Sequence, residues 1–231
     1  TGPDCARRMS AGAPAPIRSA RGSTPRLDIS TQRPMPDSSN PQLVLQNRHT
    51  GERLTIAHIR RGDQVWFSLQ GSQPPHREGP PMHIHFAEDE ELHIRAGTLS
   101  ALVQGQPVTA GPGQSTSIPR GAAHRWWNAG DEPLVFEGFA GPAVDFDRYL
   151  QAAFDVMNAG PPGRPPLFYL AHLAMRHQHT QAVLVMPAPI QAVFVRVLVA
   201  IGWLLGRYRG TDWPGSPTRC TGVPQLGRGD A

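Results

Sequence analysis

Short apolar runs that alternate with polar residues dominate residues 42–140. Val65, Phe67 and Leu69, for example, fall on one face of such a run. Glycine-containing turns separate the runs at Gly62-Asp63, Gly105-Gln106 and Gly111-Pro112. Short strands at near-regular spacing, separated by such turns, are typical of an antiparallel sandwich or barrel. The pattern therefore predicts a mainly β domain over residues 42–140.

The segments on either side of this domain differ from it in composition and period. Residues 1–41 are rich in Pro, Ser, Arg and Gly, so we expect a disordered N-terminal arm. Residues 141–209 carry apolar residues at helical spacing, which predicts an α-helical extension. Residues 210–231 return to Gly, Pro and Thr and are expected to form a loose C-terminal tail. The helices are expected near 145–160, 166–177 and 190–206.

The third of these helical segments, residues 190–206, is apolar almost all round. Its length reaches only the lower limit of the roughly 17–25 residues that span a bilayer. Arg196 lies inside it, and a charge at that depth costs about 2.5–3.5 kcal/mol on insertion scales. We therefore expect a helix buried against the β domain or against the second subunit of a homodimer. Membrane association through residues 190–206 is the less favoured alternative.

Charge and cysteine content exclude several classes of protein. All 22 basic residues are arginine, and in residues 41–140 eight of them stand against ten acidic residues. A nucleic-acid-binding domain would concentrate positive charge, so we expect no nucleic-acid partner. The two cysteines, Cys5 and Cys220, form no metal-binding cluster in the sequence. Residues 1–40 contain no apolar leader, so we expect a cytoplasmic protein.

Metal-ligating side chains gather within two stretches of the predicted β domain. His83 and His85 are two residues apart, so both side chains leave the same face of a strand. Glu90 has the parity of the inward-pointing residues of the next strand, and His124 comes from the second stretch. Three imidazoles and a carboxylate suit one divalent transition metal with coordination positions left open. Since the set has no thiolate, a structural zinc site is disfavoured.

These two stretches resemble the two motifs of the cupin superfamily. The first motif, G(X)5HXH(X)3–4E(X)6G, is matched from His83 to Gly97. It departs from the pattern at the leading glycine, since only three residues separate Gly79 from His83, where the pattern has five. Fifteen residues then separate the two motifs, which suits a single-domain cupin. The second motif, G(X)5PXG(X)2H(X)3N, is matched at Gly113, Pro119, Gly121, His124 and Asn128.

The resemblance implies a jelly-roll β-barrel with a metal inside, held by His83, His85, Glu90 and His124. Among Fe, Mn, Ni, Cu and Zn, it favours Fe or Mn. It further implies a metal-dependent enzyme, a dioxygenase-like oxygenase or an isomerase, that acts on a small organic molecule. The alternative is a non-catalytic cupin that binds a metal or small ligand as a sensor or scaffold. Glu90 is the one catalytic candidate, acting as a base.

Three further residues are candidates for the wall of a substrate pocket. Trp126 shares strand parity with His124, so it is expected to face the cavity or to belong to the ordinary core. Phe67 and Leu102 are also expected to point inward. Such a pocket would be apolar.

Other ionisable residues near the motifs are expected at the surface. The acidic residues that flank Glu90 are expected to lie in a solvated turn, with Glu88 as the less favoured alternative to Glu90 in the ligand set. Three later histidines are expected at a solvated helix end. These residues are Glu88, Asp89 and Glu91, and His172, His177 and His179.

Overall fold

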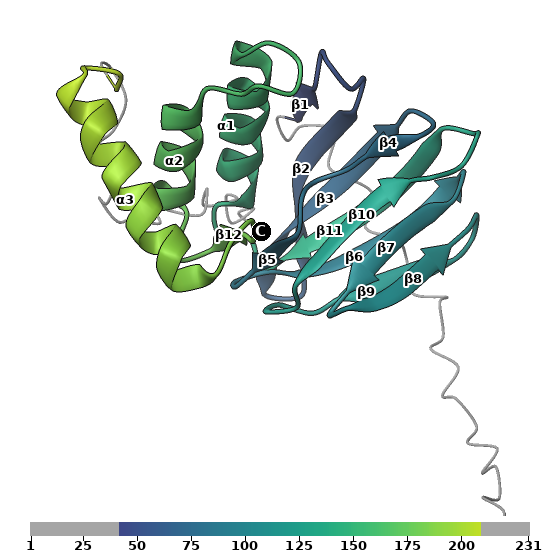
Figure 1. Cartoon of the computed structure of the whole chain (residues 1–231). Helices are drawn as coiled ribbons and strands as arrows, with labels where there is room; N and C mark the ends of the chain where they lie inside the picture. Colours follow the sequence, from purple (N-terminus) through teal and green to yellow (C-terminus); the bar gives the residue numbers. More distant parts are fainter. Residues whose placement is uncertain (1–41, 209–231) are drawn as a thin grey trace, which may run out of the picture. The chain divides into compact units, whose positions relative to one another are not determined.

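The computed structural model describes residues 42–208, whose strands form two antiparallel sheets (Figure 1). The first sheet has the order β1-β2-β3-β11-β6-β9, with bounds Leu43–Gln46, Arg53–Arg61, Gln64–Gln73, Leu134–Gly141, Asp89–Ala96 and Ser115–Ile118. The second has the order β12-β5-β10-β7-β8, with bounds Gln181–Val183, His83–His85, His124–Asn128, Leu99–Val103 and Gln106–Ala110. The short strand β4 (Arg77–Glu78) also pairs with β10. The predicted mainly β fold is confirmed.

Alternation along each strand creates the shared core between the sheets. In β10, for instance, His124, Trp126 and Asn128 are buried, whereas Arg125 and Trp127 are partly exposed. Successive strand residues point to opposite faces, so each sheet turns one apolar face inward. The core includes Ile56, Phe67, Leu69, Leu92, Ile94, Leu99, Ile118, Leu134 and Phe136.

The predicted barrel is not closed. Along the described residues, no strand ladder joins the first sheet to the second, so the jelly roll is a sandwich of two sheets. A helix meets the outer edge of β1 instead of another strand. Nδ2 of Asn158 donates a hydrogen bond to the carbonyl oxygen of Gln46 (2.8 Å), and Oδ1 of Asn158 accepts one from the backbone NH of Arg48 (2.9 Å). Covering an edge in this way removes the need to pair it.

Three helices follow the strands, as predicted: α1 (Phe146–Ala159), α2 (Leu167–Arg176) and α3 (Ala188–Leu204). Phe146 and Phe154 of α1 are buried in the core of the sheets. Between α2 and α3 the chain returns to the second sheet as β12, a strand that the sequence pattern did not predict. The strands and helices of residues 42–208 lie in one compact unit. The helical extension is therefore built into the β domain.

The outermost helix, α3, corrects the expectation that residues 190–206 are buried against the β domain. It packs on α2, where Val199 lies in a small core with Ala171 and Tyr208 (Figure 1). Its opposite side is exposed. Among the described helices, none is long and apolar enough to cross a membrane.

The predicted N-terminal arm and C-terminal tail, with Cys5 and Cys220, lie outside the described residues.

Candidate metal centre

Three histidines converge on the inner face of the second sheet. His83 and His85 leave the same face of β5, and both are buried. His124 of β10 lies directly opposite His83 in the antiparallel pairing, so their ring centroids are 4.1 Å apart. The ligating nitrogens of all three residues lie within 4.8 Å of one another. The predicted convergence of His83, His85 and His124 is confirmed.

Glu90 reaches this group from the other sheet. It lies on β6, where Ala140 and Ile118 flank it in the neighbouring strands. Its Oε2 atom is 3.3 Å from Nε2 of His124 and 3.8 Å from Nε2 of His85. The carboxylate thus faces two of the three histidines across the core of the sandwich.

Backbone carbonyls set the tautomers of two of these histidines. Nδ1 of His83 lies 2.8 Å from the carbonyl oxygen of Pro81, and Nδ1 of His124 lies 2.9 Å from that of Ala122. Because a carbonyl oxygen only accepts hydrogen bonds, each Nδ1 carries the proton in the neutral ring. Each Nε2 therefore offers its lone pair to the site. Metal-ligating histidines are commonly oriented by such a bond from their second nitrogen.

Buried nitrogens without hydrogen-bond partners show whether these residues fit a metal. Within the described residues, both ring nitrogens of His85 and Nε2 of His124 are buried without a hydrogen-bond partner. The contact between Nε2 of His124 and the carboxylate of Glu90 has a geometry outside that of a hydrogen bond. An unsatisfied buried polar atom costs about 1–3 kcal/mol. Coordination of a metal by these nitrogens would remove that cost, so the residues fit a metal.

The electrostatics of the site also suit metal ligation. Burial and the neighbouring imidazoles lower the pKa of His83 to about 3, and burial lowers that of His85 to about 4. Burial alone would raise the pKa of Glu90, but the nearby His124, His85 and His83 outweigh it and lower the pKa to about 2. Burial acts to lower the pKa of His124, yet the adjacent Glu90 raises it. Two neutral imidazoles and a charged carboxylate are ligating forms at neutral pH.

The C-terminal extension pairs with the strand that carries two of the candidate ligands, His83 and His85. β12 pairs with β5 so that Gln181 lies opposite His85 and Val183 opposite His83. The carbonyl oxygen of His85 accepts a hydrogen bond from the backbone NH of Gly121 (2.7 Å), which ties β5 to the turn before His124. The ring of Phe146, at the start of α1, stands edge-on to His85 at 4.9 Å. Without residues beyond 140, β5 would be an edge strand.

Behind this strand lies a buried polar cluster, which corrects two expectations. Glu88 was expected in a solvated turn but is fully buried, and Nε2 of Gln181 donates a hydrogen bond to its carboxylate (3.3 Å). His177 was expected at a solvated helix end but is 2% exposed, and its Nδ1 lies 2.7 Å from Oδ2 of Asp145. Burial and the neighbouring Asp145 raise the pKa of Glu88 to about 8. The cluster fastens the Glu90 turn to the extension.

Trp126 shares the inner face with His124, and the structure places it in the apolar core. Its ring lies edge-on to Phe136 at 5.4 Å and packs against Gly79. The backbone NH of Gly79 donates to the carbonyl oxygen of Trp126 (3.1 Å), and a Cβ at position 79 would collide with Trp126. Gly79, where the first motif departs from the family pattern, is therefore a position of close backbone approach.

Phe67 points inward but is separated from the histidines by another ring. It is fully buried on β3 and shares a row with Ala140 and Glu90 across the sheet. Its ring centroid is 6.1 Å from that of Phe146, which in turn contacts His85. Phe146 was not predicted as a site residue, because its helical pattern indicated only a buried helix face.

Leu102 does not point inward, so its predicted place in the pocket wall is wrong. In the β10–β7 pairing Leu102 lies opposite Arg125, whereas Val103 lies opposite His124. Gln104 and Gly105, both with positive φ, form the tight turn that pairs Val103 with Gln106. This turn fixes the register, and Val103 packs against the core in place of Leu102.

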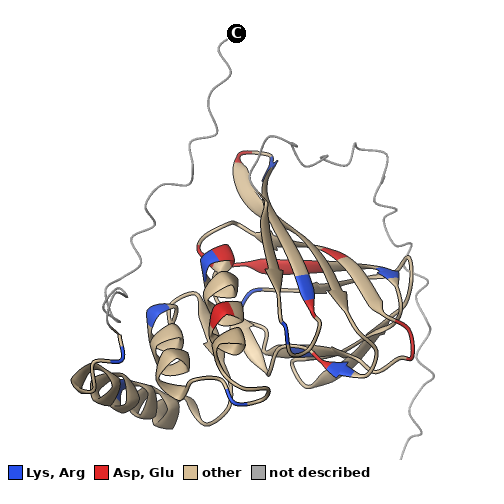
Figure 2. Ribbon diagram, turned by 90° about the horizontal axis from the view of Figure 1, so that it is seen from above, with Lys and Arg blue, Asp and Glu red and all other residues tan. Residues whose placement is uncertain are grey.

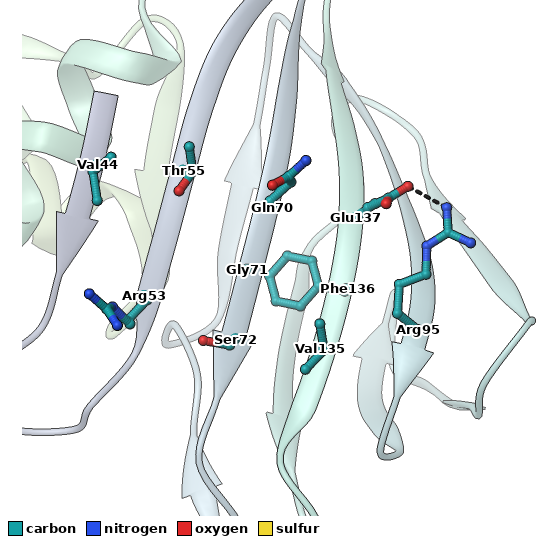
Figure 3. Close-up of a pocket in the computed structure, with 10 residues that line it drawn as sticks. All are labelled: Val44, Arg53, Thr55, Gln70, Gly71, Ser72, Arg95, Val135, Phe136 and Glu137. Carbon is teal, nitrogen blue, oxygen red and sulfur yellow. Dashed lines mark hydrogen bonds and ion pairs between the residues drawn. The ribbon is translucent and has the colours of Figure 1, made fainter. Parts of the chain in front are cut away.

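A hollow of about 360 Å³ lies on the outer face of the first sheet, away from the histidines (Figure 3). Arg53, Gln70, Arg95 and Glu137 are among its lining residues, and Arg95 forms an ion pair with Glu137 there. Gln70 and Glu137 face each other on the side of the sheet opposite the core. None of the four candidate ligands lines this hollow.

Comparison with known proteins agrees with this geometry. Residues 69–139 match the family model of the cupin domain, a range that contains all four candidate ligands. The curated protein "Oxidoreductase iacF" of Pestalotiopsis fici is 37% identical over 79 residues, which are 33% of this chain and 39% of that protein. The match therefore spans well under half the length of this relative.

Solved structures with similar strands share little sequence with the chain. KdgF from Halomonas sp. is 18% identical, with a TM-score of 0.37 over 44% of this chain and 88% of that one. The Cnp3 cupin domain of Schizosaccharomyces pombe is 15% identical, with a TM-score of 0.36 over 43% and 67% of the two chains. A sugar phosphate isomerase from Silicibacter pomeroyi is 18% identical, with a TM-score of 0.32 over 38% and 58%.

The family match at residues 69–139 contains both histidine motifs, and its strands form the two-sheet fold that places those histidines face to face. Three buried histidines in this domain could hold a metal ion. The chain therefore carries a cupin domain over residues 69–139.

Proposed function

We propose that the protein is a metal-dependent oxygenase that acts on a small organic molecule, with the metal held by His83, His85, His124 and Glu90. The observation that carries the proposal is the convergence of three buried imidazoles whose nitrogens lie within 4.8 Å. The buried nitrogens of His85 and His124 that have no partner among the described residues support it further. The oxidoreductase name of the relative from Pestalotiopsis fici supports the choice of reaction class.

The chemistry of the ligand set favours iron(II) or manganese(II). Three imidazole nitrogens and one carboxylate oxygen leave coordination positions open on a six-coordinate ion, and mixed nitrogen and oxygen donors suit these metals. Such a metal would supply Lewis-acid and redox chemistry to a bound substrate. The chain's own residues orient the donors: Pro81 and Ala122 fix two rings through their carbonyl oxygens.

Glu90 is the residue best placed to handle a proton. Its carboxylate is charged at neutral pH, because the surrounding histidines hold its pKa at about 2. It is 6% exposed and lies beside both His85 and His124. In that position it can complete the ligand set or accept a proton from a substrate hydroxyl group at the same atom, Oε2. A general base must lie within hydrogen-bond reach of the proton it removes.

The surroundings of the site favour an apolar substrate. Phe146 contacts His85, and Phe67 lies behind Phe146. Aromatic side chains of this kind exclude water and favour planar apolar molecules. An aromatic or enolisable compound with one oxygen donor fits this environment better than a sugar does.

A non-catalytic cupin that binds a metal or small ligand is the second candidate. One observation favours it, since each of the four candidate ligands is no more than 8% exposed. A site so enclosed suits retention of a ligand as well as turnover. Such a protein would act as a sensor or scaffold through its helical extension.

Oxygen consumption separates the two candidates. The full chain, loaded with iron(II) or manganese(II), is incubated with a panel of phenols and 1,3-diketones in an oxygen electrode. We expect uptake that depends on both metal and substrate, is abolished in His83→Ala and is retained in His93→Ala, a histidine on the outer face that bonds Ser115. Tight binding of a panel compound without oxygen uptake, with either metal, would favour the non-catalytic candidate.

A further inference from the structure

Within residues 42–208, no segment covers one side of α3 along its length. Figure 1 shows α3 as the outermost helix, with only its inner side against α2. Val199 and Gly202, on that inner side, are buried. The large apolar residues of the other side are between 41% and 75% exposed. These residues, here called the α3 face, are Ile190, Val193, Phe194, Val197, Ile201 and Leu204.

The α3 face is a continuous stripe, unlike the scattered apolar residues that any protein surface carries. Its members recur at intervals of three or four residues, so they lie one above another along four turns of the helix. Trp203 and Leu205 beside the stripe are also more than half exposed. Contiguous exposed apolar surface of this extent marks a docking site.

The charged residues of the described segment from 156 to 208 are all basic, apart from histidines. Residues 156–208 contain no Asp or Glu, whereas Arg164, Arg176, Arg196 and Arg207 lie in that segment. Figure 2 shows blue positions but no red on α2 and α3, in contrast to α1. Arg196 is exposed on α3 and donates a hydrogen bond to the carbonyl oxygen of Ala192 (3.0 Å). Arg207 follows the helix and is also exposed.

We propose that the α3 face docks on the surface of an anionic lipid bilayer. An apolar helix face beside two exposed arginines, Arg196 and Arg207, is complementary to acyl chains beneath negatively charged headgroups. A second copy of the chain fits less well, because pairing two α3 faces would bring Arg196 and Arg207 of both copies together, and residues 156–208 contain no Asp or Glu to offset this positive charge. The helix is too short to cross the membrane, so it lies in the interface.

Sedimentation with lipid vesicles tests the proposal. The full chain is mixed with vesicles of phosphatidylcholine alone, or of three parts phosphatidylcholine to one part phosphatidylserine, and the pelleted fraction is measured. We expect partition into the anionic vesicles at least about tenfold stronger than into the neutral ones, since each arginine near such a surface strengthens binding about fivefold. Raised salt weakens binding to the anionic vesicles by screening the arginines.

Two variants and a matched control locate the docking face. Val197→Glu/Ile201→Glu places charges in the middle of the α3 face and is expected to lower partition at least about tenfold. Arg196→Gln/Arg207→Gln is expected to remove most of the preference for anionic vesicles. The control is Val44→Glu, which places a charge at a residue of β1 that is 62% exposed and lies outside the α3 face. This variant is expected to leave partition into the vesicles unchanged. Circular dichroism confirms that each variant is folded.

Two outcomes would overturn the proposal. One is equal, weak pelleting with both kinds of vesicle. The other is a lipid-free dimer, detected by sedimentation equilibrium, that Val197→Glu/Ile201→Glu dissociates, because the α3 face would then belong to a second copy. Neither outcome depends on the metal centre, so neither of them tests the proposed oxygenase function.

Discussion

Two regions of the molecule differ in what they bury. The space between the two sheets buries ionisable side chains, whereas the outer face of α3 exposes apolar ones. Between the sheets, three histidines and a glutamate are at most 8% exposed. On the α3 face, six large apolar side chains are at least 41% exposed. Burying ionisable groups and exposing apolar ones both cost free energy in an isolated chain. We infer that each region is completed from outside the chain, the first by a metal and the second by lipid.

The largest effect on the free energy of unfolding is expected at His177, which helps to attach the C-terminal extension behind the metal centre. His177→Ala removes the imidazole that contacts Asp145 and leaves a carboxylate that is 3% exposed without this hydrogen-bond partner. Breaking a buried pair on one side costs about 3–5 kcal/mol. We expect a loss of that size in the free energy of unfolding, measured with urea at pH 7. His179→Ala, at an exposed neighbour, serves as the control and is expected to stay within about 0.5 kcal/mol. Equal losses would refute a special role for His177.

A slightly smaller effect is expected at the carboxylate of the metal centre. Glu90→Gln keeps the size of the side chain but removes the charge that faces His85 and His124. We expect metal affinity to fall about 100-fold, or about 2.7 kcal/mol, in competition with a chromophoric chelator. The control is Glu91→Gln, which alters the ion pair with Arg61 on the outer face and leaves affinity unchanged. Unaltered affinity in Glu90→Gln would remove this residue from the ligand set.

Acid is expected to weaken the contact between Asp145 and His177, which attaches the extension, and so to lower the free energy of unfolding. Burial acts to raise the pKa of Asp145, but the hydrogen bond from His177 outweighs it and holds the pKa below the usual 3.8. A carboxyl group with a lowered pKa in the folded state stabilises the protein above its unfolded pKa, and this contribution is lost as the pH falls through the folded pKa. We expect the stability difference between the wild type and Asp145→Asn to narrow below about pH 4, by at most about 1.4 kcal/mol per pH unit. A constant difference down to pH 2 would contradict the assignment.

The smallest effect separates the two sides of α3. Val197 lies on the α3 face and is 50% exposed. Val197→Ser is therefore expected to change the free energy of unfolding by less than about 0.5 kcal/mol in lipid-free solution. Val199→Ser, two residues away and 2% exposed, is expected to cost about 2 kcal/mol by burying a hydroxyl and losing apolar contacts. Thermal unfolding of both variants measures the contrast. Equal costs would mean that the α3 face is covered in the free protein.

The sequence predicted the histidines of the site because the direction of a strand side chain follows from local spacing. His83 and His85 share a strand face by their spacing, and strand parity placed Glu90 inward. The fold class followed from alternation and turns over residues 42–140. Leu102 was misplaced because its run, Leu99 to Val103, is apolar at most positions, so periodicity alone leaves its inward face ambiguous. The turn at Gln104-Gly105 determines that face.

Contacts between distant segments could not be predicted in the same way. Glu88 is buried because Gln181, 93 residues later, returns in β12 to cover it. A strand of three residues carries too little pattern to be recognised. The position of α3 was missed for a related reason, since a helix that is apolar all round does not indicate which side packs on the protein.

The metal content of the purified protein tests the central claim most directly. The full chain is isolated without chelator, reconstituted with iron(II) or manganese(II), and analysed for metals beside His83→Ala/His124→Ala and His93→Ala. We predict about one metal ion per chain in the wild type and in His93→Ala, and none in the double variant. A wild type that retains no metal after reconstitution, or a double variant that retains as much as the wild type, would contradict the metal centre.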